Sequence, residues 1–176
     1  MRRLLVFSLA LVVIIADQTS KIWAVKYLSL GRVLVIFPRY VELAYTTNTG
    51  AAFGMFHSAT LVLGFIALVT GIGIALYVLY FCKGLNTYKI IAIGLILGGA
   101  LGNFVDRFRL HYVVDFIDIH LGSYQWPVFN VADSAICVGV ALLAIRYATV
   151  RSSDTHISHK QIISSNVSEP SAASSE

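Results

Sequence analysis

Charged residues are scarce in this chain of 176 residues. Asp, Glu, Lys and Arg together make up 12% of it, whereas an ordinary soluble domain contains about 25%. Hydrophobic residues make up 57%, so the composition excludes a soluble globular domain and predicts an integral membrane protein. The net charge of +4 comes from basic residues scattered singly or in pairs among apolar runs. Because these residues form no basic patch, we also expect no nucleic-acid binding.

Cysteine and the standard catalytic motifs are nearly absent as well. The two cysteines, Cys82 and Cys137, fall inside apolar runs, which is typical of small buried side chains and not of a disulfide framework. The sequence has no HExxH, no Walker phosphate loop and no G-x-S-x-G, which argues against zinc-peptidase, kinase and serine-hydrolase activity. The histidines and acids of residues 111–120 fit no standard zinc spacing. We therefore expect no metal and no cofactor.

Long apolar runs are what the chain has instead. A helix needs about 20 mostly apolar residues to cross a bilayer. Four segments meet this requirement, and they cover residues 4–25, 59–82, 90–105 and 127–145. The first imitates a secretory signal but lacks a small-residue cleavage site, so we expect it to remain as an uncleaved span.

The segments outside these spans have two distinct compositions. Between the first two spans, the runs VLVIF and YVELAY are β-branched and aromatic, which predicts a small sheet on the membrane surface. The expected fold is an all-α integral membrane protein of four transmembrane helices with a small extracytoplasmic β-rich element. Residues 1–150 are expected to form this single domain. Residues 151–176 are polar and rich in serine, which predicts a disordered cytoplasmic tail.

The alternating direction of four spans predicts where their polar residues lie. Asp17, Asp106, Arg107 and Asp133 all fall at span ends on one side of the membrane, opposite both termini. The loops that carry Asn48 and Asp115 lie on that side too, so one polar site can collect all six residues. Basic residues are slightly more numerous on the side of the termini, which favours cytoplasmic termini.

Two of these acids, Asp115 and Asp133, stand in apolar surroundings. Two carboxylates that meet in a low dielectric cannot easily both ionise, so one keeps its proton while the other acts as a base. Such a pair suits peptide hydrolysis. From spacing alone, a proton relay in a small proton-coupled transporter and a structural role in a non-catalytic scaffold remain alternatives.

Two further patterns indicate how the helices pack. Asp17 and Lys21 are four residues apart, so in a helix they share a face and can form a structural ion pair. Gly94, Gly98 and Gly102 repeat at the same spacing, which predicts a flat ridge that another helix approaches closely.

Five short motifs, taken together and in order, resemble those of the lipoprotein signal peptidases, the type II signal peptidases of bacteria. They are DQTSK at residues 17–21, NTGAAF at 48–53, GNFVDR at 102–107, VVDF at 113–116 and FNVAD at 129–133. The resemblance implies an aspartic endopeptidase that cleaves the signal peptide from diacylglyceryl-modified prolipoproteins just before the lipidated cysteine. It says nothing about the serine-rich tail.

The resemblance also implies roles for single residues. Asp115 of VVDF and Asp133 of FNVAD match the catalytic dyad. Asn48, Arg107 and Asn130 match polar residues that line the site for the substrate and for the antibiotic globomycin.

Outside this site, Asp17 and Lys21 match positions associated with a stable fold. The implied partners are the lipid-modified prolipoprotein, membrane lipid and a globomycin-type inhibitor, and nothing in the sequence requires more than a monomer. The implied location is the bacterial inner membrane, with both termini cytoplasmic and the active site near the outer leaflet.

Overall fold

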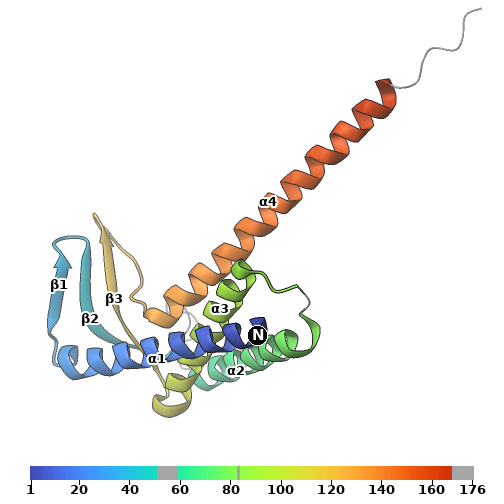
Figure 1. The fold of residues 1–176 in the computed structure, drawn as a ribbon. Coiled ribbons are helices and arrows are strands. Elements are labelled where there is room, and N and C mark those ends of the chain that lie inside the picture. The colour runs from blue at the N-terminus through green and yellow to red at the C-terminus, as the bar shows by residue number, and fades with distance from the viewer. Residues whose placement is uncertain (51–58, 83, 168–176) are drawn as a thin grey trace, which may run out of the picture. The chain divides into compact units, whose positions relative to one another are not determined.

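Four helices dominate the computed structural model, which describes residues 1–50, 59–82 and 84–167, with side chains up to residue 149 (Figure 1). Their bounds are Arg2–Leu28 for α1, Thr60–Leu76 for α2, Thr87–Leu110 for α3 and Val131–Val167 for α4. A short π-helical turn, η2 (Tyr77–Phe81), continues α2. Within the described residues, α1, α3, α4 and the continuous helix of α2 and η2 each contain a segment long and apolar enough to cross a membrane. The prediction of four apolar helices is therefore confirmed.

Helix α3 is longer than the uncharged run that predicted it, because its polar ends are helical too. Its first turn is capped by Asn86, whose side chain accepts a hydrogen bond of 3.2 Å from the backbone N–H of Lys89. It ends at His111, which adopts a left-handed conformation with φ 63°. Asn103, Asp106 and Arg107 consequently lie on the last two turns of a regular helix.

The β-rich element is a four-stranded antiparallel sheet in the order β1-β2-β3-β4. Its strands are Val33–Phe37, Val41–Asn48, Val113–Leu121 and Tyr124–Gln125. The sequence predicted only the first two strands. β3 comes from the segment after α3 and pairs with β2, so that Thr46 lies opposite Asp115. The sheet thus brings the loop after α1 beside the segment that carries Asp115, near the end of α1 (Figure 1).

Glycines on α3 let the neighbouring helices approach closely. A Cβ atom added at Gly98 would lie 2.6 Å from the Cβ of Val13 and 2.7 Å from the carbonyl oxygen of Ala10, both on α1. An added Cβ at Gly102 would lie 2.7 Å from a carboxylate oxygen of Asp17. The predicted glycine ridge is therefore the contact surface between α3 and α1.

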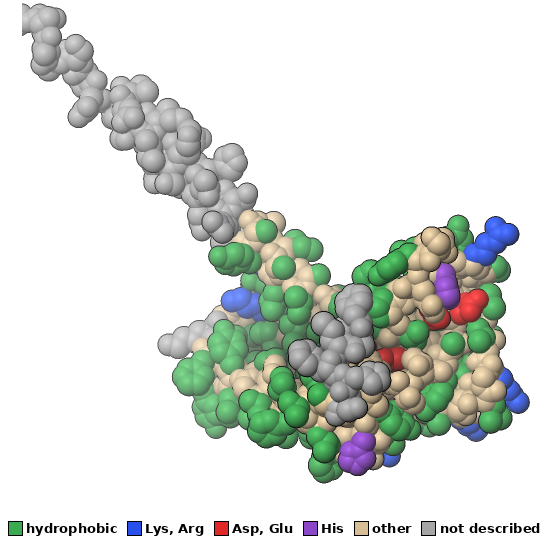
Figure 2. Space-filling view, turned by 180° about the vertical axis from the view of Figure 1, so that it is seen from behind, with side chains coloured by type: hydrophobic (Ala, Val, Ile, Leu, Met, Phe, Trp, Pro, Cys, Tyr) green, Lys and Arg blue, Asp and Glu red, His purple; other side chains and the backbone are tan. Residues whose placement is uncertain are grey.

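The outer surface of the helices is apolar. Figure 2 shows hydrophobic side chains over most of the helical surface in view, whereas most charged side chains in view lie around the sheet. On α2 the exposed large side chains include Leu61, Val62, Phe65, Ile66, Val69 and Ile72. An apolar surface of this extent fits contact with lipid and not with water.

The chain divides into two compact units, Met1–Val140 and Ala141–Glu176. All the site residues predicted from the sequence lie in the first unit. In the second unit, α4 continues to Val167, past the predicted domain boundary at residue 150. Residues 168–176 lie outside the described part of the chain, and the disordered tail over residues 151–176 stays a prediction.

The close contact between α1 and α3 leads to a prediction about stability. Gly98→Ala should lower the free energy of unfolding by about 1–3 kcal/mol, because its methyl group meets the backbone of α1 and forces the helices apart. The matched control is Gly73→Ala on α2, where an added Cβ has no neighbour within 4 Å. Thermal unfolding in detergent should show a lower midpoint for Gly98→Ala alone. Equal midpoints for the two variants would contradict the packing.

Candidate active site

A buried lysine stands at the centre of the polar cluster. The ammonium of Lys21 lies 2.8 Å from a carboxylate oxygen of Asp17 and 3.0 Å from one of Asp106. It also donates a hydrogen bond of 3.0 Å to the side-chain oxygen of Asn103. The predicted ion pair between Asp17 and Lys21 is thus present, and α3 supplies two further acceptors. Since an ammonium has three N–H donors, all of them have a partner.

The two carboxylates around Lys21 each hold another element in place. Asp17 accepts a hydrogen bond of 3.0 Å from the backbone N–H of Ala132, in the first turn of α4. Asp106 accepts one of 3.1 Å from the backbone N–H of Val114, near the start of β3. The cluster therefore fixes the two elements that carry the predicted catalytic acids.

Asp133 lies in the first turn of α4, where it takes part in a reciprocal cap. The side-chain oxygen of Asn130 accepts a hydrogen bond of 2.9 Å from the backbone N–H of Asp133. In return, the Asp133 carboxylate accepts one of 3.3 Å from the backbone N–H of Asn130. This arrangement is a capping box, which satisfies N–H groups that the start of a helix leaves free. A carboxylate near one end of an apolar helix thus has a structural reason to be there.

Asn130 also connects this helix start to Asp115. Its side-chain N–H donates a hydrogen bond of 2.7 Å to one carboxylate oxygen of Asp115. The side-chain N–H of Asn48 donates one of 3.1 Å to the other. Phe129, just before Asn130, pairs through its backbone with Ile117 of β3. The two acids, far apart in the chain, are therefore held around one shared asparagine.

Asp115 is almost completely buried, with 1% of its surface exposed. The pKa of its carboxyl is raised from 3.8 to about 6, chiefly by burial and also by the negative charge of Asp133. The hydrogen bonds from Asn48 and Asn130 oppose this increase, because they favour the ionised form. A carboxyl with this pKa can hold a proton near neutral pH and can also release it.

Arg107 lies at the edge of the cluster, beside Gly50. One terminal N–H group of its guanidinium donates a hydrogen bond of 3.1 Å to the carbonyl oxygen of Gly50. Its Nε atom is buried and has no hydrogen-bond partner among the described residues. The charge of this guanidinium interacts with those of Asp133 and Asp115. Residues 51–53 of the NTGAAF motif lie outside the described residues.

The structure thus gathers all seven residues that the sequence singled out into one cluster of contacts. It also includes Asp106, which the sequence placed on the same side of the membrane, and it adds two residues that were given no role, Asn103 and Gln18. The side-chain amide of Gln18 donates hydrogen bonds to both Asp17 and Asp106. A signal for Asn103 was present in the sequence, because Asn103 and Asp106 are three residues apart and therefore share one face of α3.

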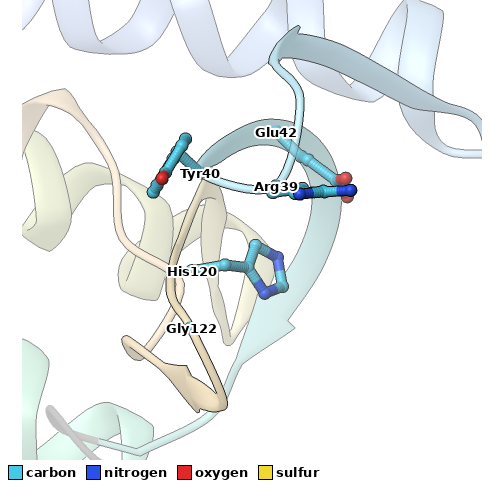
Figure 3. A pocket seen from close by; sticks show the side chains of 5 residues that line it. All are labelled: Arg39, Tyr40, Glu42, His120 and Gly122. Atoms are coloured by element: carbon cyan, nitrogen blue, oxygen red, sulfur yellow. The ribbon is translucent and has the colours of Figure 1, made fainter.

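A separate polar pocket of about 380 Å³ lies at the far end of the sheet. Its lining residues are Arg39, Tyr40, Glu42, His120 and Gly122 (Figure 3). Residues 115 and 120 point to opposite faces of β3, because side chains alternate along a strand. This pocket is therefore not part of the cluster around Asp115. In the described part of the chain, no group of three or more His, Cys, Asp and Glu side chains is placed to hold a metal ion.

Comparison with known proteins gives a consistent result. The sequence profile of the family described as Signal peptidase (SPase) II matches residues 9–149. The lipoprotein signal peptidase of Syntrophotalea carbinolica is 39% identical over 140 residues, which cover 78% of this chain and 86% of that protein.

Two solved structures, each described as a bacterial membrane enzyme determined by the in meso method, are also similar. The structure at 2.3 Å resolution is 30% identical, with a TM-score of 0.74 over 84% of this chain and 90% of that one. The structure at 1.9 Å is 31% identical, with a TM-score of 0.71 over 81% and 91%. Because the family profile covers most of the chain, and a relative of this identity matches over nearly the same length, the chain belongs to the signal peptidase II family.

Proposed function

We propose that this protein is an aspartic endopeptidase whose catalytic dyad is Asp115 and Asp133. As a member of the signal peptidase II family, it cleaves the signal peptide from prolipoproteins. The observation that carries the proposed mechanism is the position of Asn130, which hydrogen-bonds to Asp115 through its side chain and to Asp133 through both side chain and backbone. The dyad is therefore preorganised before any substrate binds.

The proposed reaction needs one proton shared between the two carboxyl groups. The ionised carboxylate takes a proton from water, whose oxygen attacks the scissile carbonyl carbon. The neutral carboxyl donates its proton to the carbonyl oxygen. The carbon–nitrogen bond then breaks as the leaving amine receives a proton from the dyad. The raised pKa of Asp115 supports this sharing, because one carboxyl can stay neutral where an exposed aspartate would be ionised.

Asn48 and Arg107 are the proposed contacts with the substrate backbone. Both border Gly50, whose N–H donates to Asn48 and whose carbonyl oxygen accepts from Arg107. The Nε of Arg107 has no partner among the described residues, so we propose it as a donor to a peptide carbonyl. A globomycin-type inhibitor would compete for the same groups. Asn130 is fully buried and its side chain is already bonded on both ends, so we propose that it acts on the substrate by holding Asp115.

The proposed location follows from the apolar helices and the side on which the site lies. We place the protein in the bacterial inner membrane as a monomer, with cytoplasmic termini and the sheet and dyad near the outer leaflet. The signal peptide and the lipid group of the substrate would then reach the dyad from the bilayer, against the exposed apolar side chains. The transporter alternative has no support from the family profile or from the relatives.

The first test of the dyad is cleavage of a diacylglyceryl-modified precursor by the protein in lipid vesicles. Asp115→Asn and Asp133→Asn should each lower the cleavage rate by at least about 100-fold, because each removes a group that transfers a proton. The matched control is Asp118→Asn, on the same strand as Asp115 but on its opposite face, which should cleave normally. If either dyad variant cuts at the wild-type rate, the proposed dyad is wrong.

A second test concerns the proton on Asp115. In the substrate-free protein, infrared titration should show a protonated carboxyl that loses its proton around pH 6 and that is missing in Asp115→Asn. The sign follows from burial, which disfavours the charged form and so shifts the loss of the proton to higher pH than the ordinary value of 3.8. Binding of a peptide inhibitor that excludes water should shift it higher still. A midpoint near pH 4 in the free protein would contradict the proposed sharing.

A further inference from the structure

In the described part of the chain, Asn103 is the side chain that joins the buried lysine to Asp133 directly. It lies on α3 and is 5% exposed. Its side-chain oxygen accepts hydrogen bonds of 3.0 Å from Lys21 and 3.1 Å from Asn130. Its side-chain N–H group donates one of 2.7 Å to the carboxylate of Asp133. A single amide therefore stands between a permanent cation and one of the two proposed catalytic acids.

The orientation of this amide is fixed by the chemistry of its neighbours. The oxygen and nitrogen ends of an asparagine have nearly the same shape, so the hydrogen-bond partners decide which way it points. An ammonium can only donate, so the oxygen must face Lys21 and the N–H group must face Asp133. Lys21 cannot turn away, because Asp17 and Asp106 hold its other two donors. Asp133 is thereby always offered a donor at 2.7 Å.

The contact made by the second carboxylate oxygen of Asp133 also favours the ionised form of this side chain. It accepts the backbone N–H of Asn130 in the capping box, at the start of α4. The N-terminal end of a helix carries a partial positive charge, which stabilises a carboxylate there. Hydrogen bonds donated to both oxygens favour the charged form as well. Two features therefore stabilise the Asp133 carboxylate. One is the oriented amide of Asn103, which is itself bonded to Lys21, and the other is the N-terminal end of α4.

Asp115 receives two side-chain amide donors but lacks the other two features. It lies within a strand, whose dipole is small. Its link to Lys21 is longer than that of Asp133, because it passes through two amides, those of Asn130 and Asn103. The charged groups around the pair are Arg107, Lys21, Asp17 and Asp106. Among them Arg107 acts on both acids, and Lys21 acts on Asp115 through its charge as well. The difference between the two acids therefore depends on Asn103 and on the start of α4.

We propose that Asn103 is a positioning residue that keeps Asp133 ionised, so that Asp133 is the general base and Asp115 carries the shared proton. This inference rests on the proposed function, because it assigns the two roles within the same dyad. Asp133 takes a proton from water as the water oxygen bonds to the carbonyl carbon, and Asp115 gives its proton to the carbonyl oxygen. Asp133 then protonates the leaving nitrogen as the carbon–nitrogen bond breaks, and a hydroxyl of the intermediate returns a proton to Asp115.

The assignment is tested by titrating each acid alone. Asp133→Asn leaves Asp115, and Asp115→Asn leaves Asp133, while the variant with both substitutions provides the infrared baseline. We expect the lone Asp115 to take up its proton at a higher pH than the lone Asp133. The opposite order, or equal midpoints, would overturn the assignment. This result does not depend on cleavage, so it is separate from the test of the dyad itself.

The part played by Asn103 needs its own comparison. In the Asp115→Asn background, Asn103→Leu should let Asp133 take up its proton at a pH about one unit higher, because a hydrogen bond to a charged group is lost. In the Asp133→Asn background the same change should shift Asp115 much less. Equal shifts in both backgrounds, or none, would show that Asn103 is merely structural. The control is Asn86→Asp. This substitution lies at the start of α3, far from the site, and retains a side chain that can cap the helix, so neither acid should shift.

Cleavage kinetics provide a second measurement, in which Asn103→Leu is the only substitution. Asn103→Ser replaces it if the leucine variant does not fold. Asn103 has no proposed contact with the substrate, so its loss should lower kcat by about tenfold or more and leave KM nearly unchanged. The acidic limb of the kcat profile should also move to higher pH, because Asp133 must be ionised to act as base. A rise in KM at constant kcat would contradict the positioning role.

Discussion

The arrangement of the site depends on the three contacts of one buried ammonium, that of Lys21. Removing a lysine from water costs several kcal/mol, and only close partners offset this cost. Lys21 has three such partners at 2.8 to 3.0 Å, Asp17 on its own helix and Asp106 and Asn103 on α3. Two of these partners carry negative charge. The ion pair that the sequence suggested as a structural feature therefore also supports the two elements that carry the proposed dyad.

Each partner of Lys21 also forms a hydrogen bond to a different part of the site. Asp17 reaches the start of α4, Asp106 reaches the start of β3, and Asn103 reaches Asp133 directly. These contacts require α1 and α3 to approach closely, which the glycines of α3 allow. Helix packing, ion pairing and the proposed chemistry are thus linked, because a shift of α1 against α3 would move the two elements that carry the proposed acids.

Local sequence patterns predicted the parts of this structure that depend on neighbouring residues. The apolar runs predicted four helices, and the four-residue spacings predicted the Asp17–Lys21 pair and the glycine ridge. β3 was missed, because it pairs with β2 across about 70 residues and its hydrophobic pattern does not reveal its partner. The contacts of Asn103 were missed for a similar reason, since its partners come from α1 and from the start of α4. The capping box could have been recognised, because an asparagine three residues before an aspartate opens the fourth apolar run.

We expect Lys21 to organise the site as well as to hold the helices together. The most direct measurement compares cleavage of the lipid-modified precursor by Lys21→Met and Lys26→Met, two variants of the same helix, with the unfolding midpoint recorded for each. Lys21→Met should lose at least about 100-fold in cleavage rate, because Asp133 and Asp115 lose their shared support, while Lys26→Met should cleave as the wild type does. A folded Lys21→Met variant that cleaves at the wild-type rate would show that Lys21 only holds the helices together.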